Sequence, residues 1–130
     1  MSDYILVVDD EPDVREILEL VLGTLQLPVQ DVHNGYDALI AIQEDLPLVM
    51  LLDLQMPEYD GQYVLDQLKR RNIMLPIIIF TSHDITADLA DKLDISEERM
   101  FQKGSVSMTK LRHQVIEIVG EKLQIDISLL

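Results

Sequence analysis

Residues 48–53 read Leu-Val-Met-Leu-Leu-Asp, and residues 54–61 continue as Leu-Gln-Met-Pro-Glu-Tyr-Asp-Gly. Five apolar residues in a row predict a short strand that is buried on both faces of a sheet. Pro57 and Gly61 predict a turn, which places Asp53 where the strand leaves the core. A carboxylate is costly to bury there unless another group pairs with it or uses it. Asp53 is therefore either a functional residue or simply the first polar residue of a loop.

The pattern of an apolar run that ends in polar residues recurs along the chain. Further strands are predicted at about 4–8, 28–32, 76–80 and 99–102. Helical spacing of apolar residues predicts helices at about 12–25, 61–71, 85–93 and 108–119, and a further helix that Ala38, Leu39 and Ile42 mark and that ends before Pro47. Strand and helix thus alternate five times, which predicts an α/β fold with a doubly wound parallel sheet and helices on both faces.

Right-handed crossovers place the carboxyl ends of all parallel strands along one edge of the sheet. The polar residues at these ends are Asp9 and Asp10 after the first strand, Asp53 after the third, Thr81 after the fourth and Lys103 after the fifth. In the doubly wound strand order 2-1-3-4-5, the first and third strands are neighbours, and ligands bind at this edge. This order predicts that Asp9, Asp10 and Asp53 lie together.

Three carboxylates in one pocket repel each other unless a cation neutralises them. With oxygen ligands only, the expected cation is Mg²⁺, with Mn²⁺ as a substitute. Thr81 would add a hydroxyl donor, and Lys103 would add a positive charge. Such a site suits the oxygens of a transferring phosphoryl group, with Asp53 as the nucleophile that becomes an aspartyl phosphate. Taken singly, Lys103 could form an ordinary salt bridge and Thr81 could bond to backbone.

Composition narrows the class of partner. The chain has 130 residues, and this length predicts a single domain. Its formal net charge is −14. Such a charge disfavours binding to nucleic acid or to an anionic membrane, and favours a divalent cation or a basic protein surface. The absence of cysteine excludes disulfides and thiolate metal sites and is compatible with a cytoplasmic location. Neither a signal peptide nor a membrane-spanning stretch is predicted.

The ordered set of strand-end residues resembles the receiver domain of two-component response regulators, the CheY-like family. The resemblance covers about residues 3–120 and rests on the following motifs: Asp9-Asp10 after an apolar strand, Asp53-Leu54-Gln55-Met56-Pro57 with Gly61 after three further residues, Thr81-Ser82, and Lys103. No single motif is decisive, but their order on successive strand ends is highly specific.

The resemblance implies that Asp53 accepts a phosphoryl group from a phosphohistidine of a histidine kinase or a phosphotransfer protein. It also implies that Asp10, Asp53 and the backbone carbonyl of Gln55 bind Mg²⁺, while Asp9 acts through the water shell of the metal. Thr81 and Lys103 would then bind the phosphoryl oxygens.

In the family, the residues two beyond the acceptor and two beyond the threonine tune the lifetime of the phosphoryl group. Here these residues are Gln55 and His83. Movement of the threonine would signal to the face of the fourth helix, the fifth strand and the last helix, through which a target protein or a second copy would bind.

The sequence departs from the family at the switch position, which usually carries an aromatic residue and here carries Met100. Phe101 is adjacent but should point to the opposite face of the strand, because side chains alternate along a strand. Lys103 is followed by Gly104 where the family usually has a proline with a cis bond, so we expect a trans bond here.

The favoured hypothesis is a signalling module of residues 1–122 that catalyses its own phosphorylation and dephosphorylation and has no separate substrate. Residues 123–130 would form a tail, either the end of the last helix or a frayed segment. Three alternatives stay open: a receiver-like adaptor that is not phosphorylated, an aspartyl-nucleophile phosphatase, and a flavodoxin-like electron carrier. The phosphatase would need Asp-x-Asp after the first strand, and the electron carrier would need a phosphate-binding loop there.

Overall fold

The computed structural model describes residues 3–105 and 107–124. Its sheet has five parallel strands in the order β2-β1-β3-β4-β5, which confirms the predicted class and order. The strands are β1 (Ile5–Val8), β2 (Val29–Val32), β3 (Val49–Leu52), β4 (Ile77–Thr81) and β5 (Met100–Gln102). The helices are α1 (Pro12–Gly23), α2 (Gly35–Glu44), α3 (Gly61–Arg70), α4 (Ala87–Leu93), the 3-10 turn η1 (Glu97–Arg99) and α5 (Met108–Leu123).

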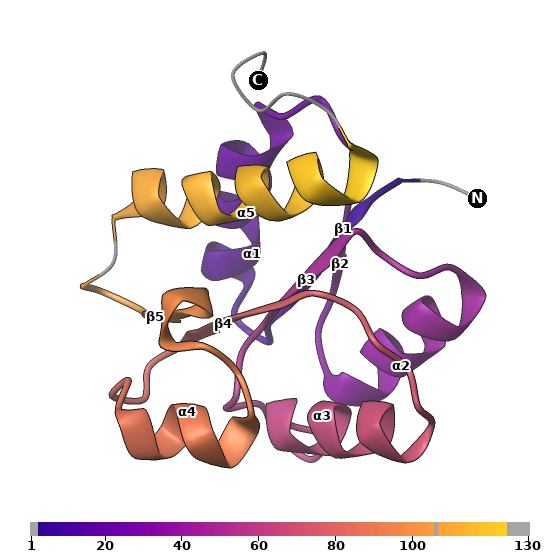
Figure 1. The fold of residues 1–130 in the computed structure, drawn as a ribbon, viewed down its shortest axis with the longest axis vertical. Helices are drawn as coiled ribbons and strands as arrows, with labels where there is room; N and C mark the ends of the chain where they lie inside the picture. The colour runs from indigo at the N-terminus through magenta and orange to yellow at the C-terminus, as the bar shows by residue number, and fades with distance from the viewer. Residues whose placement is uncertain (1–2, 106, 125–130) are drawn as a thin grey trace.

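Helices cover both faces of the sheet: α1 and α5 lie on one face, and α2, α3 and α4 lie on the other (Figure 1). Successive residues of a strand point to opposite faces, so each central strand supplies both cores. Leu6 and Met50 pack toward α2 and α3, whereas Val7 and Leu51 pack toward α1 and α5. This double burial explains why β1 and β3 are apolar at every position.

The register of the two central strands brings their carboxyl ends level. Val8 of β1 is opposite Leu52 of β3. The ladder continues one residue further, because the Asp53 amide donates to the Val8 carbonyl at 3.0 Å and the Asp9 amide donates to the Val32 carbonyl at 3.2 Å. Asp9 and Asp53 therefore leave the sheet side by side.

Side-chain caps begin the two helices that follow β2 and β3. Asn34 accepts from the Asp37 amide, and Asp60 accepts from the Tyr63 amide, each at 2.9 Å. Helix α1 begins instead at Pro12, whose missing N–H suits a first turn, and Glu11 makes no capping hydrogen bond there. The carboxylate of Glu11 is therefore free to contact other elements.

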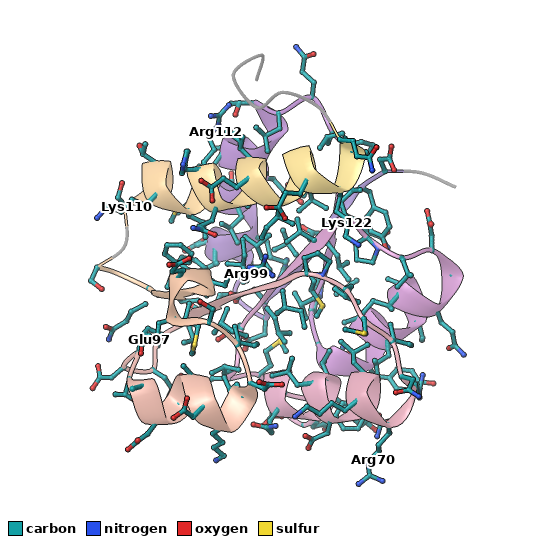
Figure 2. The ribbon with its side chains drawn as sticks, viewed as in Figure 1. Arg70, Glu97, Arg99, Lys110, Arg112 and Lys122 are labelled. Atoms are coloured by element: carbon teal, nitrogen blue, oxygen red, sulfur yellow. The ribbon has the colours of Figure 1, made fainter. Side chains whose placement is uncertain are left out.

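On the other face, Arg112 of α5 donates from Nε to the hydroxyl of Thr24 at 2.9 Å (Figure 2). This bond ties α5 to the end of α1, where apolar residues of both helices meet over the sheet. Several boundaries differ from expectation. Arg99 belongs to η1 rather than to a strand, and α2 begins at Gly35, before Ala38, which is the first residue that marks this helix in the sequence. Helix α4 begins at Ala87, because the Thr86 hydroxyl accepts from the Leu89 amide at 3.1 Å and caps the helix there.

The bond between Lys103 and Gly104 is trans, as expected, and Gly104 has a φ of 86°. Helix α5 ends at Leu123, and residues 125–130 of the predicted tail lie outside the described residues, so the domain boundary at 122 stays a prediction. Within residues 3–105 and 107–124, every helix is too short or too polar to cross a membrane.

Candidate functional site

The ammonium group of Lys103 lies among three carboxylates at the edge of the sheet. Its Nζ is 2.8 Å from Asp9 Oδ2, 3.1 Å from Asp53 Oδ2 and 3.0 Å from Glu11 Oε1. The side chains of Asp9 and Asp53 are only 2% and 3% exposed. The three predicted residues Asp9, Asp53 and Lys103 thus come together from three different strand ends.

Backbone pairing positions Lys103. Its amide donates to the Thr81 carbonyl at 2.7 Å, which extends the β4–β5 ladder by one residue. Its ammonium lies 5.8 Å from the centre of the Phe80 ring, a favourable cation–π distance. The Lys103 side chain is only 11% exposed, so most of it is shielded from solvent where it contacts the carboxylates.

The pKa directions follow from this arrangement. Burial is the largest influence on Asp9 and raises the pKa of its carboxyl, although Lys103 and the Glu11 amide act in the opposite direction. Burial by itself would lower the pKa of Lys103. Its hydrogen bonds to Asp9 and Glu11, with the charges of Asp9 and Asp53, outweigh burial and raise the pKa. Lys103 is therefore a cation at neutral pH.

The two buried aspartates have the same local geometry. Asp53 Oδ1 accepts from the Gln55 amide at 3.2 Å, and Asp9 Oδ1 accepts from the Glu11 amide at 3.0 Å. Each is a turn in which the side chain binds the amide two residues on. The Oδ2 atom of each side chain is left to face Lys103.

Gly61 explains the spacing between Asp53 and the next helix. A Cβ atom at position 61 would lie 2.4 Å from the Asp53 carbonyl oxygen and 2.8 Å from Leu54 Cα. Those are backbone atoms, so any larger residue would push away the segment that carries Asp53. The first turn of α3 therefore packs directly against the loop of the acceptor candidate.

The donor set fits a hard divalent cation. One carboxylate oxygen from each of Asp9, Asp10, Glu11 and Asp53 can be chosen so that all four lie within 4.8 Å of one another. Ligands on opposite sides of a bound Mg²⁺ are about 4 Å apart, since each Mg–O distance is about 2.1 Å. Lys103 supplies only one positive charge to these four carboxylates, so the cluster as a whole stays anionic.

Thr81 ends β4 and is fully buried. Its hydroxyl accepts from the His83 amide at 3.3 Å. A hydrogen bond to backbone is what we expected of Thr81 if it were only a polar residue at the end of a strand. The β3–β4 register, in which Leu52 is opposite Ile79, brings Thr81 to the same edge of the sheet as Asp53, one residue beyond the position opposite it. Gln55 and His83 are both exposed at the rim of the site.

The residues of the predicted switch point to opposite faces of β5, as expected. Met100 is buried with Ala90 and Leu93 of α4. Phe101 is half-buried and packs on the other face, in the core that α5 covers. The methionine therefore takes the inner position on the α4 side, and Phe101 does not replace it.

Sequence reasoning missed two contributors to the site. Glu11 binds Lys103, and Arg15 donates from Nη1 to the Asp9 backbone carbonyl at 2.8 Å. Glu11 could have been found from the acidic run that continues past the Asp9-Asp10 doublet. Arg15 is one turn further along α1, and its contact is to backbone, which a residue pattern does not indicate.

Comparison with known proteins identifies the family that shares these features. Residues 5–116 match the family described as "Response regulator receiver domain", which is most of the chain. The chain belongs to this family. A receiver domain is the signalling module of a two-component response regulator, so the family resemblance inferred from the strand-end motifs is confirmed.

Two curated relatives of this receiver domain are regulatory proteins. The DNA-binding transcriptional regulator NtrC of Salmonella typhimurium is 42% identical over 77 residues, which is 59% of this chain and 16% of NtrC. The response regulator MprA of Mycobacterium bovis is 37% identical over 103 residues, which is 79% of this chain and 45% of MprA. The chain thus spans less than half the length of either relative.

Solved structures confirm the receiver fold. The receiver domain of the Francisella response regulator 1452 has a TM-score of 0.81 at 23% identity, covering 92% of this chain and 98% of that one. The response regulator TrrA of Thermotoga maritima, solved in complex with Mg²⁺ and BeF, has a TM-score of 0.74 at 26% identity. The structural match covers 89% of this chain and 98% of the TrrA chain.

Proposed function

We propose that this receiver domain takes a phosphoryl group onto Asp53 from the phosphohistidine of a histidine kinase or a phosphotransfer protein. The observation that carries the proposal is the contact of Lys103 with Asp53 and Asp9 in an otherwise acidic pocket. A buried carboxylate beside a lysine and further carboxylates suits the transfer of an anionic group better than it suits a purely structural role.

In the proposed step, an Asp53 oxygen attacks the phosphorus atom, the P–O bond forms and the P–N bond to the donor imidazole breaks. The electron pair of that bond returns to the imidazole nitrogen. Lys103, already 3.1 Å from Asp53 Oδ2, would bind a phosphoryl oxygen, and the buried hydroxyl of Thr81 would bind another. Hydrolysis of the acyl phosphate by water restores the carboxylate.

Asp10, Asp53 and the Gln55 carbonyl are the proposed ligands of Mg²⁺ or Mn²⁺, and Asp9 would hold metal-bound water. A bound divalent cation would neutralise charge on the transferring phosphoryl oxygens. Support comes from the four clustered carboxylates of this chain and from the similar TrrA, whose structure contains Mg²⁺ and BeF. We also propose that Gln55 and His83, exposed at the rim, tune the lifetime of the phosphoryl group.

The proposed output is a change in protein binding at the face of α4, β5 and α5. A depression of about 400 Å³ on this face is lined by Phe101 of β5 and by residues of η1 and α5. Figure 2 shows Lys110 at the end of α5 nearest β5 and Glu97 between α4 and β5, on the same side of the molecule. Phe101 lines this depression, whereas Met100 is buried in the core that α4 covers. The proposed partner at this face is a target protein or a second copy. The net charge of −14 argues against direct contact with nucleic acid or a membrane.

Intact mass after incubation with a small acyl phosphate donor and Mg²⁺ tests the proposal. We expect a gain of one phosphoryl group, and we expect no gain when EDTA is present during the incubation or when Asp53 is replaced by Asn. Ser82→Ala serves as the matched control, because Ser82 is exposed beside the site and should leave labelling intact. No gain under conditions that label a known receiver would instead favour the adaptor that is not phosphorylated.

A further inference from the structure

The guanidinium group of Arg15 contacts the acidic site from the α1 side without touching a carboxylate of the proposed metal set. Its Nη1 donates to the backbone carbonyl of Asp9 at 2.8 Å. The side chain is only 12% exposed, so the contact is covered from solvent. Charge-assisted hydrogen bonds of this kind are stronger than neutral ones, and the planar guanidinium also fixes their direction.

The carbonyl that Arg15 binds belongs to the peptide unit that joins Asp9 to Asp10. Because a peptide unit is planar, fixing its carbonyl also fixes the N–H and the Cα of Asp10. The other groups of Asp9 are already held, since its amide binds the Val32 carbonyl and its Oδ1 binds the Glu11 amide. Arg15 therefore holds the remaining backbone group before Asp10.

Asp31 orients Arg15 in turn. Its Oδ2 lies 3.7 Å from Arg15 Nε, and Asp31 is fixed in β2 opposite Val7 of β1. Glu19 is one turn further along α1, and the neighbouring Asp31 carboxyl raises the pKa of the Glu19 carboxyl. The contacts thus run from β2 through Arg15 to the Asp9 carbonyl.

We propose that Arg15, oriented by Asp31, is a positioning residue that holds the Asp9–Asp10 peptide so that the Asp10 carboxylate faces Asp53 at the spacing a divalent cation needs. The inference rests on the proposed function, because it assigns Asp10 to the metal set. Replacing a group that orients the ligands of a metal typically weakens metal affinity by about 10- to 100-fold.

The direction in which Mg²⁺ affinity changes when Arg15 is removed distinguishes a positioning role from a purely electrostatic effect of its charge. Arg15 is a cation close to four carboxylates, so its removal should tighten Mg²⁺ binding if only Coulomb forces act. Positioning requires the opposite result, because a loosened peptide would no longer present the Asp10 carboxylate. A purely structural role would lower thermal stability and leave the Mg²⁺ affinity unchanged.

Two measurements test the proposal. Calorimetric titration of the full chain with Mg²⁺, without a phosphodonor, gives the metal affinity, and thermal unfolding of the metal-free protein gives its stability. Arg15→Gln should weaken Mg²⁺ binding about tenfold. Arg15→Lys keeps the charge but loses the planar fork, and should also bind more weakly than wild type. Asp31→Asn should weaken binding less, and its effect should disappear in the Arg15→Gln background. Glu16→Gln changes a charged side chain at the neighbouring, exposed position on α1 and is the control that should match wild type.

Tighter or unchanged Mg²⁺ binding in folded Arg15→Gln overturns the inference, as does a loss of thermal stability with unchanged affinity. If Arg15→Gln does not fold, Arg15→Lys and Asp31→Asn decide, and wild-type affinity in both overturns the inference. Failure of the wild-type chain to bind Mg²⁺ would overturn the proposed metal site and this inference together. Weak binding by the variants against normal binding by wild type supports both.

Discussion

Lys103 Nζ lies 3.1 Å from Asp53 Oδ2, although 50 residues separate the two in the chain. Both side chains are largely buried, and Asp9 contacts the same ammonium. Buried charges of this kind are tolerated only when they are paired, so the metal-free protein depends on Lys103 to offset its acidic cluster. During the proposed phosphoryl transfer, the same lysine would bind the incoming group.

Replacing Lys103 with Met should destabilise the metal-free protein by about 3 kcal/mol, because Asp9 and Asp53 would be buried without a compensating charge. Urea denaturation with EDTA present measures the loss. Lys92→Met is the matched control, since Lys92 is exposed on α4 and should change stability by less than about 0.5 kcal/mol. Mg²⁺ should restore part of the lost stability, because it binds the folded state preferentially. Equal stability of the two variants would contradict this role of Lys103.

Replacing Asp10 with Asn should stabilise the metal-free protein by about 1 kcal/mol, because one of four mutually repelling carboxylates is removed. The described residues include no cation in an ion pair with Asp10, so no salt bridge is lost. The same variant should lose Mg²⁺ binding, measured by titration calorimetry. Higher stability of the metal-free variant together with loss of Mg²⁺ affinity would identify Asp10 as a metal ligand. Lower stability of the metal-free variant would instead indicate a structural role for Asp10.

Gly61→Ala should lower stability by about 1–3 kcal/mol, because the new methyl group would displace the backbone of Asp53 and Leu54. The rate of phosphorylation by a small donor should fall with it. Gly23→Ala is the counterpart, since a Cβ there has nothing within 4 Å and the residue ends α1. That change should raise stability by up to about 1 kcal/mol. Equal effects at both glycines would exclude the close approach as the cause.

The wild-type protein should lose stability at high pH through Tyr4, and the Tyr4→Phe variant should not show this loss. Burial, followed by the charges of Asp45 and Glu44, raises the pKa of Tyr4 from 10.0 to about 12. The unfolded chain therefore loses the phenolic proton first, and stability present below pH 10 falls by up to about 3 kcal/mol as the pH rises toward 12. Lys103, whose pKa is also raised, adds a further loss above its unfolded value of 10.5, and that loss should persist in the variant. Denaturation midpoints from pH 9 to 12 measure the slope, with exposed Tyr36→Phe as the control. An unchanged slope in Tyr4→Phe would contradict the assignment.

The sheet and the strand-end cluster were predictable because each depends on a strong local pattern. Continuous apolar runs such as 48–52 indicate buried parallel strands, and the crossover rule then places the residues after them at one edge. The order of the strands came from the doubly wound class, and from it followed the meeting of Asp9 with Asp53. Helix α4 was the weakest prediction, since its start depends on a single capping bond from Thr86.

The finer contacts of the site were not predictable. Glu11 reaches Lys103 because α1 begins at Pro12 and leaves the Glu11 side chain without a capping role. Arg15 binds a backbone carbonyl, a partner that every residue offers and that sequence therefore cannot single out. The proximity of Gly61 to the Asp53 carbonyl likewise depends on how a loop closes in three dimensions.

The central claim is that Asp53 itself carries the phosphoryl group, and chemical trapping tests it most directly. An acyl phosphate is reduced by borohydride, which converts the phosphorylated aspartate to homoserine and leaves free carboxylates unchanged. After incubation with phosphodonor and Mg²⁺, reduction and proteolysis, peptide mass spectrometry should find homoserine at position 53 only. Homoserine at position 9 or 10, or none in a sample whose intact mass shows the phosphoryl group, would contradict the claim.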